Sequence, residues 1–381
     1  MKVIAFYLPQ FHPIPENDKL WGTGFTEWTN VKKAKKYKDD QYQPREPLND
    51  NYYDLRDISV IRWQTELAKE YGIYGFCIYH YWFNGKLLLE KPLEMMLEAK
   101  DIKFPYCICW ANENWTNQWK ANTNYEVFFE QKYGNRNDWE NHFEYLYQFF
   151  IDDRYIKING KPLLVIYRPD IIENIDEMLY FWNEKAKEYG LKGLCFAYQK
   201  VDEAFFNFEN GKDKMFDYHI EYQPSSVMNW AQSKKMKKIV EIKRKVFRWL
   251  GEHLDTNVFT TIIVKTGGMA RDYDKDWTAI LKHEPKSRKD VPCAFVDWDN
   301  TPRRGRRGIY YKNVSCKSFG AYFKELIKKA EKQYAKDFLF VFAWNEWAEG
   351  GYLEPDKKNR YGYLEAIKEA LVNADSIFEN Y

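Results

Sequence analysis

Eight short apolar runs, each followed by a longer stretch that mostly has helical periodicity, constrain the fold of this 381-residue chain more than any other feature. Runs that are apolar throughout are typical of strands buried on both faces of a parallel sheet. Eight such strands that alternate with helices predict right-handed crossovers and an α/β fold closed into a (β/α)8 TIM barrel. The predicted strands are Val3–Leu8, Gly75–Tyr79, Tyr106–Trp110, Leu163–Tyr167, Gly193–Tyr198, Asp217–Ile220, Cys293–Val296 and Phe338–Phe342.

The stretches between these runs predict helices near 57–71, 90–100, 136–151, 174–189, 233–250 and 318–335, with a last helix near 361–374. Asp57 and Asn174 suit N-caps, and Gly72 and Gly190 stand where C-cap glycines belong. A doubly wound open sheet is the competing fold, but it seldom needs eight such units and no GxGxxG follows the first run. Without a repeat or a low-complexity linker, we expect one catalytic domain over 1–381, with a less regular insertion at about 221–292.

Charge, cysteines and hydropathy exclude several classes of protein. The net charge of +2 gives no overall field that would steer the chain to nucleic acid. The six cysteines are spread out, as buried free thiols in a reducing compartment would be. The apolar run at the N-terminus is too short for a signal peptide, and no segment approaches the ~18 apolar residues that span a bilayer. These features predict a cytoplasmic enzyme.

Aromatic residues make up 19% of the chain, with 15 Trp and 30 Tyr. The flat C–H faces of sugars rest on aromatic rings, and Tyr and Trp add a polar group at the ring edge. This composition favours a carbohydrate-binding protein, although a bias towards Tyr would also raise the aromatic share.

Polar and aromatic residues collect just after the predicted strands, at the barrel face where active sites are built. Strand ends are ordinarily polar, so no single residue is decisive, but the enrichment recurs around the barrel. We predict that substrate contacts come from Glu27, Trp28, His80, Trp82, Trp110, Asn112, Glu113, Trp115, Tyr167, Arg168, Tyr198, Asp297, Trp298, Asp299, Arg303, Trp344, Asn345 and Trp347.

Carboxylates are the reactive groups that the sequence favours, because it contains no P-loop, HExxH or GxSxG motif and no metal-ligand spacing. Cleavage of a glycosidic bond needs one carboxylic acid and a second carboxylate as nucleophile or base. Neighbouring tryptophans would raise the pKa of one glutamate towards neutrality. After the eighth strand, Gly350 and Gly351 let the chain turn so that residues three apart can face one cavity. The candidates are Glu27, Glu113, Asp297, Asp299, Glu346 and Glu349.

Two basic segments carry further hypotheses. Arg303, Arg304, Arg306 and Arg307 follow the seventh strand and are able to grip a diphosphate or an acidic sugar, or else lie in a solvated loop. Residues 234–250 hold eight basic residues against one acid, with apolar residues along one stripe. That pattern suits weak contact with anionic lipid where lipid-linked glycans are built, or an ordinary surface helix.

Four motifs in order give the chain a family resemblance. GTGFTEWTNV at 22–31, WANENW at 110–115, WDNTPRRG at 298–305 and NEWAEG at 345–350 resemble the WbsX-type family. Its members are labelled glycosyltransferases of bacterial surface-polysaccharide (O-antigen or capsule) clusters, and they are similar to glycoside hydrolase family ninety-nine.

The resemblance implies a (β/α)8 barrel and a retaining, endo-α-mannosidase-like mechanism that needs no cofactor or metal. Glu346 and Glu349 match the two glutamates of an EWxE arrangement. Glu346 would act as base on the sugar's 2-hydroxyl, and Glu349 would protonate the leaving oxygen. Ala348 stands where the hydrolases carry His, which puts mannose specificity in doubt.

Two alternatives remain open at this point. One is a nucleotide-sugar-dependent glycosyltransferase, although no DxD motif is present and such enzymes normally use Rossmann-like folds. The other is a non-catalytic glycan-binding barrel. The expected partner is an oligosaccharide or polysaccharide, free or lipid-linked, met in the cytoplasm or at the inner membrane surface. The sequence leaves open the sugar, the linkage, endo or exo action, hydrolysis or transfer, and the oligomeric state.

Overall fold

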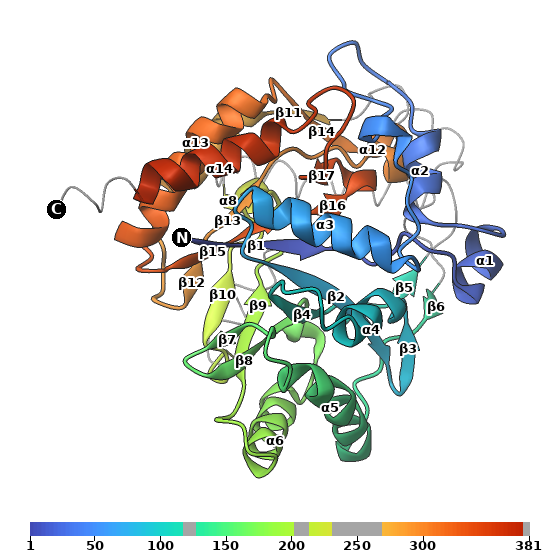
Figure 1. The fold of residues 1–381 in the computed structure, drawn as a ribbon, viewed down its shortest axis with the longest axis vertical. Coiled ribbons are helices and arrows are strands. Elements are labelled where there is room, and N and C mark those ends of the chain that lie inside the picture. Colours follow the sequence, from blue (N-terminus) through green and yellow to red (C-terminus); the bar gives the residue numbers. More distant parts are fainter. Residues whose placement is uncertain (117–126, 202–212, 231–268, 376–381) are drawn as a thin grey trace, which may run out of the picture.

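A computed structural model describes residues 1–116, 127–201, 213–230 and 269–375 of the chain. Parallel strands surrounded by helices form a barrel, as predicted (Figure 1). The sheet order is β12-β10-β9-β8-β4-β2-β1-β15-β13. These strands are β1 (Lys2–Tyr7), β2 (Gly75–Phe83), β4 (Tyr106–Trp110), β8 (Lys161–Ile166), β9 (Cys195–Gln199), β10 (Tyr218–Ile220), β12 (Asp290–Val291), β13 (Cys293–Phe295) and β15 (Phe338–Phe342).

Closure occurs at the seventh strand, which was predicted as Cys293–Val296 but begins before it, at Asp290, so that Pro292 divides the strand into β12 and β13. On one side, β12 pairs with β10 in the register His219↔Asp290. On the other side, β13 pairs with β15 in the register Cys293↔Phe340. Proline has no N–H for a ladder hydrogen bond, but the Pro292 carbonyl accepts one from Phe340 N at 3.1 Å. One extended segment therefore joins both edges of the sheet, which makes the barrel eight-stranded.

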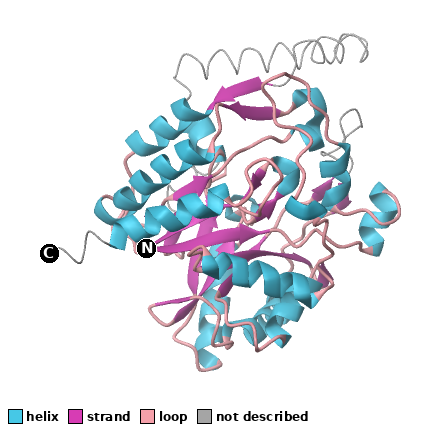
Figure 2. Ribbon diagram, turned by 45° about the horizontal axis from the view of Figure 1, so that its top comes forward, coloured by secondary structure: helices cyan, strands magenta, loops and turns pink. Residues whose placement is uncertain are grey.

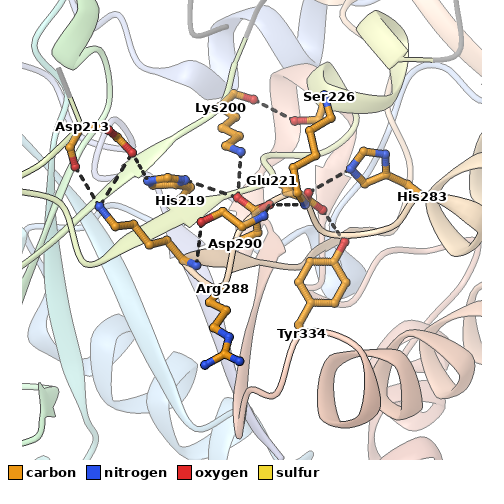
Figure 3. A network of polar contacts seen from close by, with 12 residues as sticks. Lys200, Asp213, His219, Glu221, Ser226, His283, Arg288, Asp290 and Tyr334 are labelled. Carbon is orange, nitrogen blue, oxygen red and sulfur yellow. Dashed lines mark hydrogen bonds and ion pairs between the residues drawn. The ribbon is translucent and has the colours of Figure 1, made fainter. Parts of the chain in front are cut away.

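A buried polar cluster supports this closure (Figure 3). The fully buried Asp290 accepts from Lys200 Nζ at 2.8 Å and lies 3.3 Å from His219 Nδ1. Burial alone would raise the pKa of Asp290, but these two partners and backbone N–H groups hold it well below its usual range. Beside it, Glu221 accepts from His283 Nε2 at 3.1 Å and from Tyr334. These contacts tie the short strands β10 and β12 to the outer layer of the barrel.

Helices cover the outside of the strands (Figure 2). They are α3 (Ile58–Glu70), α4 (Lys91–Glu98), α5 (Arg136–Phe150), α6 (Ile175–Glu188), α11 (Tyr273–Lys282), α13 (Cys316–Lys332) and α14 (Gly362–Asp375). Six of the predicted helices are confirmed within a few residues, whereas 233–250 lies outside the described residues. The helix α11 was not predicted, because it lies inside the segment 221–292, for which the sequence predicts a less regular insertion.

The predicted helix signals are confirmed in part. Asp57 caps α3 by accepting from Ser59 N at 2.9 Å, and Gly72 and Gly190 follow helices with positive φ. Asn174 precedes α6 but forms no capping hydrogen bond through its side chain.

Long connections at the carboxyl ends of the strands build the rest of the molecule. They contain α1 (Pro15–Trp21), α2 (Glu27–Lys33), η1 (Leu48–Asp50), β5 (Trp115–Thr116), β6 (Val127–Phe129), η3 (Pro169–Ile171), α8 (Ser225–Trp230), β11 (Met269–Asp272), α12 (Thr301–Arg304), η4 (Gly305–Arg307), β14 (Ile309–Lys312), β16 (Asn345–Glu346), η5 (Trp347–Glu349) and β17 (Gly351–Tyr352). Two short antiparallel additions, β3 (Lys86–Leu88) and β7 (Lys157–Ile158), extend β2 and β8.

The core is apolar and rich in stacked rings, such as Phe6 on Phe340 at 5.2 Å between ring centroids. All six cysteines are free, and all except Cys316 are buried, as the sequence predicted. Across the described ranges, no helix is both long and apolar enough to cross a membrane.

Candidate active site

A cleft of about 720 Å³ opens among the loops at the carboxyl ends of the strands. Its floor is aromatic, with side chains from the ends of β2, β8 and β15. Its sides come from the long loops after β1, β4 and β13. Its lining includes Gln10, Trp21, Phe25, Glu27, Tyr79, Tyr81, Glu113, Trp115, Phe128, Tyr133, Tyr167, Tyr222, Arg303, Arg304, Phe342, Glu346 and Glu349.

Glu346 and Glu349 both face this cleft from the turn after β15. Glu346 ends β16, and Glu349 ends the short helix η5 that follows it. Gly350 then takes a left-handed conformation with φ 71°, and a side chain at Gly351 would lie 2.2 Å from the Phe342 ring. The two glycines allow the chain to reverse tightly enough for β17 to pair with β16.

Arg303 joins three carboxylates in the cleft. Its Nη2 lies 2.8 Å from Glu346 Oε1 and 3.2 Å from Glu27 Oε2, while its Nη1 lies 2.8 Å from Glu349 Oε1. All four side chains are buried. One cation faces three acids, so a fully ionised group would carry an excess of negative charge.

The same environment sets the protonation of the pair. Burial raises the pKa of Glu346 well above the ordinary carboxyl range, and it also raises the pKa of Glu349. The Arg303 guanidinium opposes this rise at both residues, and Glu27 adds to it. Raised pKa values at both residues favour a protonated carboxyl group in this cleft, and a proton donor is one of the two groups that paired acid and base catalysis requires.

A further buried carboxylate, Glu354, supports the turn from behind. Its oxygens accept hydrogen bonds from Trp344 Nε1 at 3.0 Å and Trp347 Nε1 at 2.6 Å. Gln64 Nε2 at 2.7 Å and Tyr53 OH at 2.9 Å complete the set. Burial raises the pKa of Glu354 to about 7, although all four hydrogen bonds act to lower it. The carboxyl thus holds both indoles that flank the Glu346 segment.

Neighbouring acids form the frame of the Arg303 loop. Asp297 pairs with the buried Arg45 at 2.7 Å. Asp299 accepts from Gln41 Nε2 at 2.8 Å and from the Thr301 hydroxyl at 2.6 Å. Both aspartates were predicted to contact substrate, but these protein partners already satisfy them and neither lines the cleft. Asp299 also accepts from Thr301 N at 3.0 Å, so it fixes the start of α12, which carries Arg303.

The structure brings seven of the predicted site residues to the cleft lining. They are Glu27, Glu113, Trp115, Tyr167, Arg303, Glu346 and Glu349. Of these, Glu113 lies at the rim, about half exposed, where it accepts from Arg168 at 3.2 Å. Three carboxylates already pair with the Arg303 guanidinium, so in this structure the guanidinium faces acids and not an anionic ligand. Arg304 lines the cleft beside it.

Strand alternation explains why two predicted residues point away. The run at β2 continues to Phe83, beyond the predicted end at Tyr79, and successive side chains of a strand face opposite sides. Tyr79 and Tyr81 therefore face the cleft, whereas His80 and Trp82 pack outward. His80 Nε2 lies 2.9 Å from His142 Nε2, and burial lowers the pKa of His80 to about 3. His80 is thus a neutral core histidine.

The remaining predicted residues serve the framework and do not line the cleft. Asn112 binds both the N–H and the carbonyl of Arg168, at 2.8 and 2.7 Å, and Asn345 holds Leu8 in the same way. Arg168 itself is held by Asp170 at 2.7 Å. The aromatic residues in this group are packed among other rings: Trp28, Trp82, Trp110, Tyr198, Trp298, Trp344 and Trp347.

Sequence reasoning missed a second set of cleft residues. The rings of Trp21 and Phe25 stack at 5.5 Å, and the Phe128 ring meets Trp21 edge-on at 6.0 Å. This aromatic wall joins the loop after β1 to the β5–β6 hairpin. Tyr81 could have been found by extending the period-two pattern of β2, but no signal links Trp21 to Phe128 across more than a hundred residues.

Among the residues that the structure describes, no group of three or more His, Cys, Asp or Glu side chains is placed to hold a metal ion. The basic segment 234–250, with its predicted lipid contact, and the side chain of Arg307 lie outside the described parts. Both hypotheses stay predictions.

The chain is similar to known proteins in sequence and in fold. A family model described as "Glycosyltransferase WbsX" matches residues 3–367. Two uncharacterized WxcX proteins from Xanthomonas campestris pv. campestris, strains B100 and ATCC 33913, are 31% and 32% identical over 98% of this chain. The alignment covers 50% of each relative, so the chain spans about half the length of the curated relatives it matches.

Solved structures share the fold. A GH99 endo-alpha-mannosidase from Bacteroides thetaiotaomicron superposes with a TM-score of 0.54 at 13% identity, covering 99% of this chain and 98% of that one. A glycoside hydrolase-like protein gives a TM-score of 0.56 at 11% identity, with 97% and 93% coverage. At such identities the likeness concerns the barrel itself.

Proposed function

This chain belongs to the WbsX glycosyltransferase family, and from that premise we propose that it cleaves or transfers glycosidic bonds in bacterial surface-polysaccharide metabolism. The observation that carries the proposal is the buried Glu346–Arg303–Glu349 arrangement inside an aromatic cleft. Two carboxyl groups that share one cleft are the minimum for glycosidic chemistry, and aromatic walls suit the faces of sugar rings.

The proposed reaction retains configuration and uses the sugar's own 2-hydroxyl. Glu346 takes the proton of this hydroxyl, and O2 attacks C1 while the bond from C1 to the leaving oxygen breaks. Glu349 gives its proton to that oxygen. A water or an acceptor hydroxyl then opens the 1,2-anhydro ring at C1 and yields its proton to Glu349, while Glu346 returns its proton to O2. The enzyme ends each cycle in its starting protonation state.

This sequence of steps begins with a proton on Glu349 and an ionised Glu346. Burial and the neighbouring acids raise the pKa of both carboxyl groups, which favours a protonated acid in the cleft, while Arg303 favours the ionised form that the base needs. Carboxylates that are already held in place stabilise the positive charge of an oxocarbenium-like transition state, because they need not reorient during the reaction. Glu27 supplies a third buried carboxylate next to the pair, and we assign it a substrate-orienting role through its contact with Arg303.

Glutamine substitutions at the two glutamates test the proposal, with turnover of α-linked oligosaccharides and aryl glycosides as the readout. Removing either group should lower kcat by about 10²–10⁴-fold. Glu113→Gln, at the exposed rim of the same cleft, is the matched control and should change kcat far less. Proton NMR of the first product reports retention of configuration. Full activity in both Glu346→Gln and Glu349→Gln would contradict the assignment.

Two competing functions give different results in calorimetry. A nucleotide-sugar-dependent glycosyltransferase would bind nucleotide sugars tightly, whereas we expect weak binding, because four carboxylates line the cleft against Arg303 and Arg304. A non-catalytic glycan-binding barrel would bind oligosaccharides without turnover, and the two glutamine variants would then bind and behave as the parent does.

A further inference from the structure

A second pocket, of about 440 Å³, lies behind the catalytic turn, between the start of α3, the loop around η1 and the segment after β17. Its volume is within the range of small-molecule sites. Trp347 and Glu354 line it from the turn that also carries the two cleft glutamates. We propose that this pocket is an accessory binding site for a neutral sugar residue of the glycan, and this proposal rests on the proposed function.

Three partly exposed rings form the walls: Tyr52, Trp63 and Tyr361. Deeper in the pocket, Tyr53 and Trp347 are buried and packed, so these two rings close it. The Trp63 ring lies 6.2 Å from that of Tyr53, and Tyr361 stacks on Tyr71 at 6.0 Å. Rings held by such packing present rigid faces, on which the C–H face of a sugar can rest at little entropic cost.

The polar groups around these rings lack partners among the described residues. The side-chain amides of Asn49 and Asn51 form no hydrogen bond there, and neither do the Trp63 indole N–H and the hydroxyls of Tyr52 and Tyr361. Amides and hydroxyls both donate and accept, and the indole N–H donates, which matches the hydroxyl groups of a sugar. Aromatic faces combined with free neutral polar groups distinguish this pocket from an ordinary apolar depression.

Charge selects a neutral ligand. Asp50 is the acid at the rim, and its carboxylate is paired with Lys357 Nζ at 2.6 Å, which also meets Glu46 at 3.3 Å. Glu354, at the base, is saturated by its four hydrogen-bond donors. Lys32 Nζ also lies 4.1 Å from the centroid of the Tyr52 ring, so three acids stand against two lysines. An anionic sugar would meet this excess of acids, whereas a neutral sugar needs no counter-charge.

The pocket lies next to the turn that carries the two cleft glutamates, so a ligand bound there would also be held near the cleft. Trp347 stands between Glu346 and Glu349 in the chain, and its indole N–H is held by Glu354. A glycan anchored here has its other residues held close to the cleft, which raises their effective concentration there. The enzyme would therefore hold long glycans more tightly than fragments that reach only one of the two sites.

The experiment uses an inert form of the full chain, Glu346→Gln with Glu349→Gln, screened on an array of neutral, amino and acidic glycans. The best ligand is then titrated by calorimetry. We expect neutral glycans to bind, and Trp63→Ala in the inert background to weaken the affinity about tenfold. The double change Asn49→Ala with Asn51→Ala, which removes no internal hydrogen bond, should weaken it by at least threefold.

Tyr180→Ala, an exposed ring on α6, is the matched control and should leave the affinity unchanged. Circular dichroism melts separate lost binding from lost folding. Equal affinities of the parent, the Trp63 variant and the asparagine variant would overturn the proposal, as would an array signal confined to acidic glycans or absent altogether. Because binding is measured without turnover, failure of the glycosidic chemistry would appear separately, in the activity of the unmodified chain.

Discussion

Glu354→Gln tests most directly how the turn that carries Glu346 and Glu349 is held in place. Each Glu354 oxygen accepts two hydrogen bonds, so an amide NH2 in place of either oxygen faces two donors. If the NH2 replaces Oε2, the Tyr53 hydroxyl can rotate to accept, and the Trp347 indole N–H alone stays unpaired. If it replaces Oε1, both Gln64 and Trp344 lose an acceptor. The first arrangement costs less, and it places the defect between the two cleft glutamates.

The magnitude follows from two terms. One buried unpaired donor costs about 1–3 kcal/mol of unfolding free energy. The second term depends on pH, because Glu354 has a pKa of about 7 in the folded protein and an ordinary carboxyl value when unfolded. A raised pKa means that the folded state binds the proton more tightly. The stabilisation is therefore complete below the unfolded pKa of about 4.3, and it is lost as pH rises through 7, in total about 3–4 kcal/mol.

Glutamine does not titrate, so the variant lacks this second term. The difference in unfolding free energy between the parent and Glu354→Gln should shrink by about 3 kcal/mol between pH 4.5 and pH 8. Glu346 and Glu349 also have raised pKa values, but they titrate in both proteins and cancel from the difference.

Urea denaturation followed by tryptophan fluorescence at several pH values measures this difference. Glu66→Gln, at an exposed position on α3, is the control and should stay within about 0.5 kcal/mol of the parent. A difference for Glu354→Gln that does not vary with pH would refute the reasoning, since it would mean that Glu354 is already ionised throughout this range.

Three further predictions concern the cleft and the barrel closure. Arg303→Gln removes the cation that lowers the pKa of Glu346 and Glu349, so the acidic limb of the pH–rate profile should move to higher pH and kcat should fall at least 10²-fold. Asp290→Asn removes a carboxylate whose pKa is depressed on folding; the loss of unfolding free energy should be complete above the unfolded pKa of about 4 and decrease as pH falls towards the lower folded pKa, so denaturation should show a smaller loss at pH 3 than at pH 7. Trp21→Ala should raise KM for an oligosaccharide by about 5–10-fold with little change in kcat, since its ring stands in the wall of the cleft.

Much of the barrel could be predicted because its signal is local. Apolar runs such as Tyr106–Trp110 and Phe338–Phe342 match β4 and β15 at both ends. The places where prediction failed have physical causes. Pro292 interrupts the seventh strand, and the predicted strand therefore began only at Cys293. The helix α11 was not predicted because it lies within a long insertion. At β2, the predicted end at Tyr79 concealed the alternation that turns Tyr81 into the cleft and His80 out of it.

The candidate site divides in the same way. The strand-end position of the NEWAEG motif was enough to predict that Glu346 and Glu349 would share a cavity, and the structure places both there. From the sequence, Arg303 was predicted to bind substrate or an anion, and no role was predicted for Glu354. Their importance comes from partners such as Glu27, 276 positions away from Arg303, and Gln64, 290 positions away from Glu354.

The sequence by itself determined the barrel and placed two glutamates at the carboxyl end of its last strand, because periodicity and strand ends are properties of neighbouring residues. Only the tertiary structure decided which strand-end side chains reach the cleft and which carry the framework. That choice depends on closing the barrel, since closure brings the loops after β1, β13 and β15 together around one arginine. Asp297 and Asp299 became supports for this reason, while Trp347 gained a second pocket behind it.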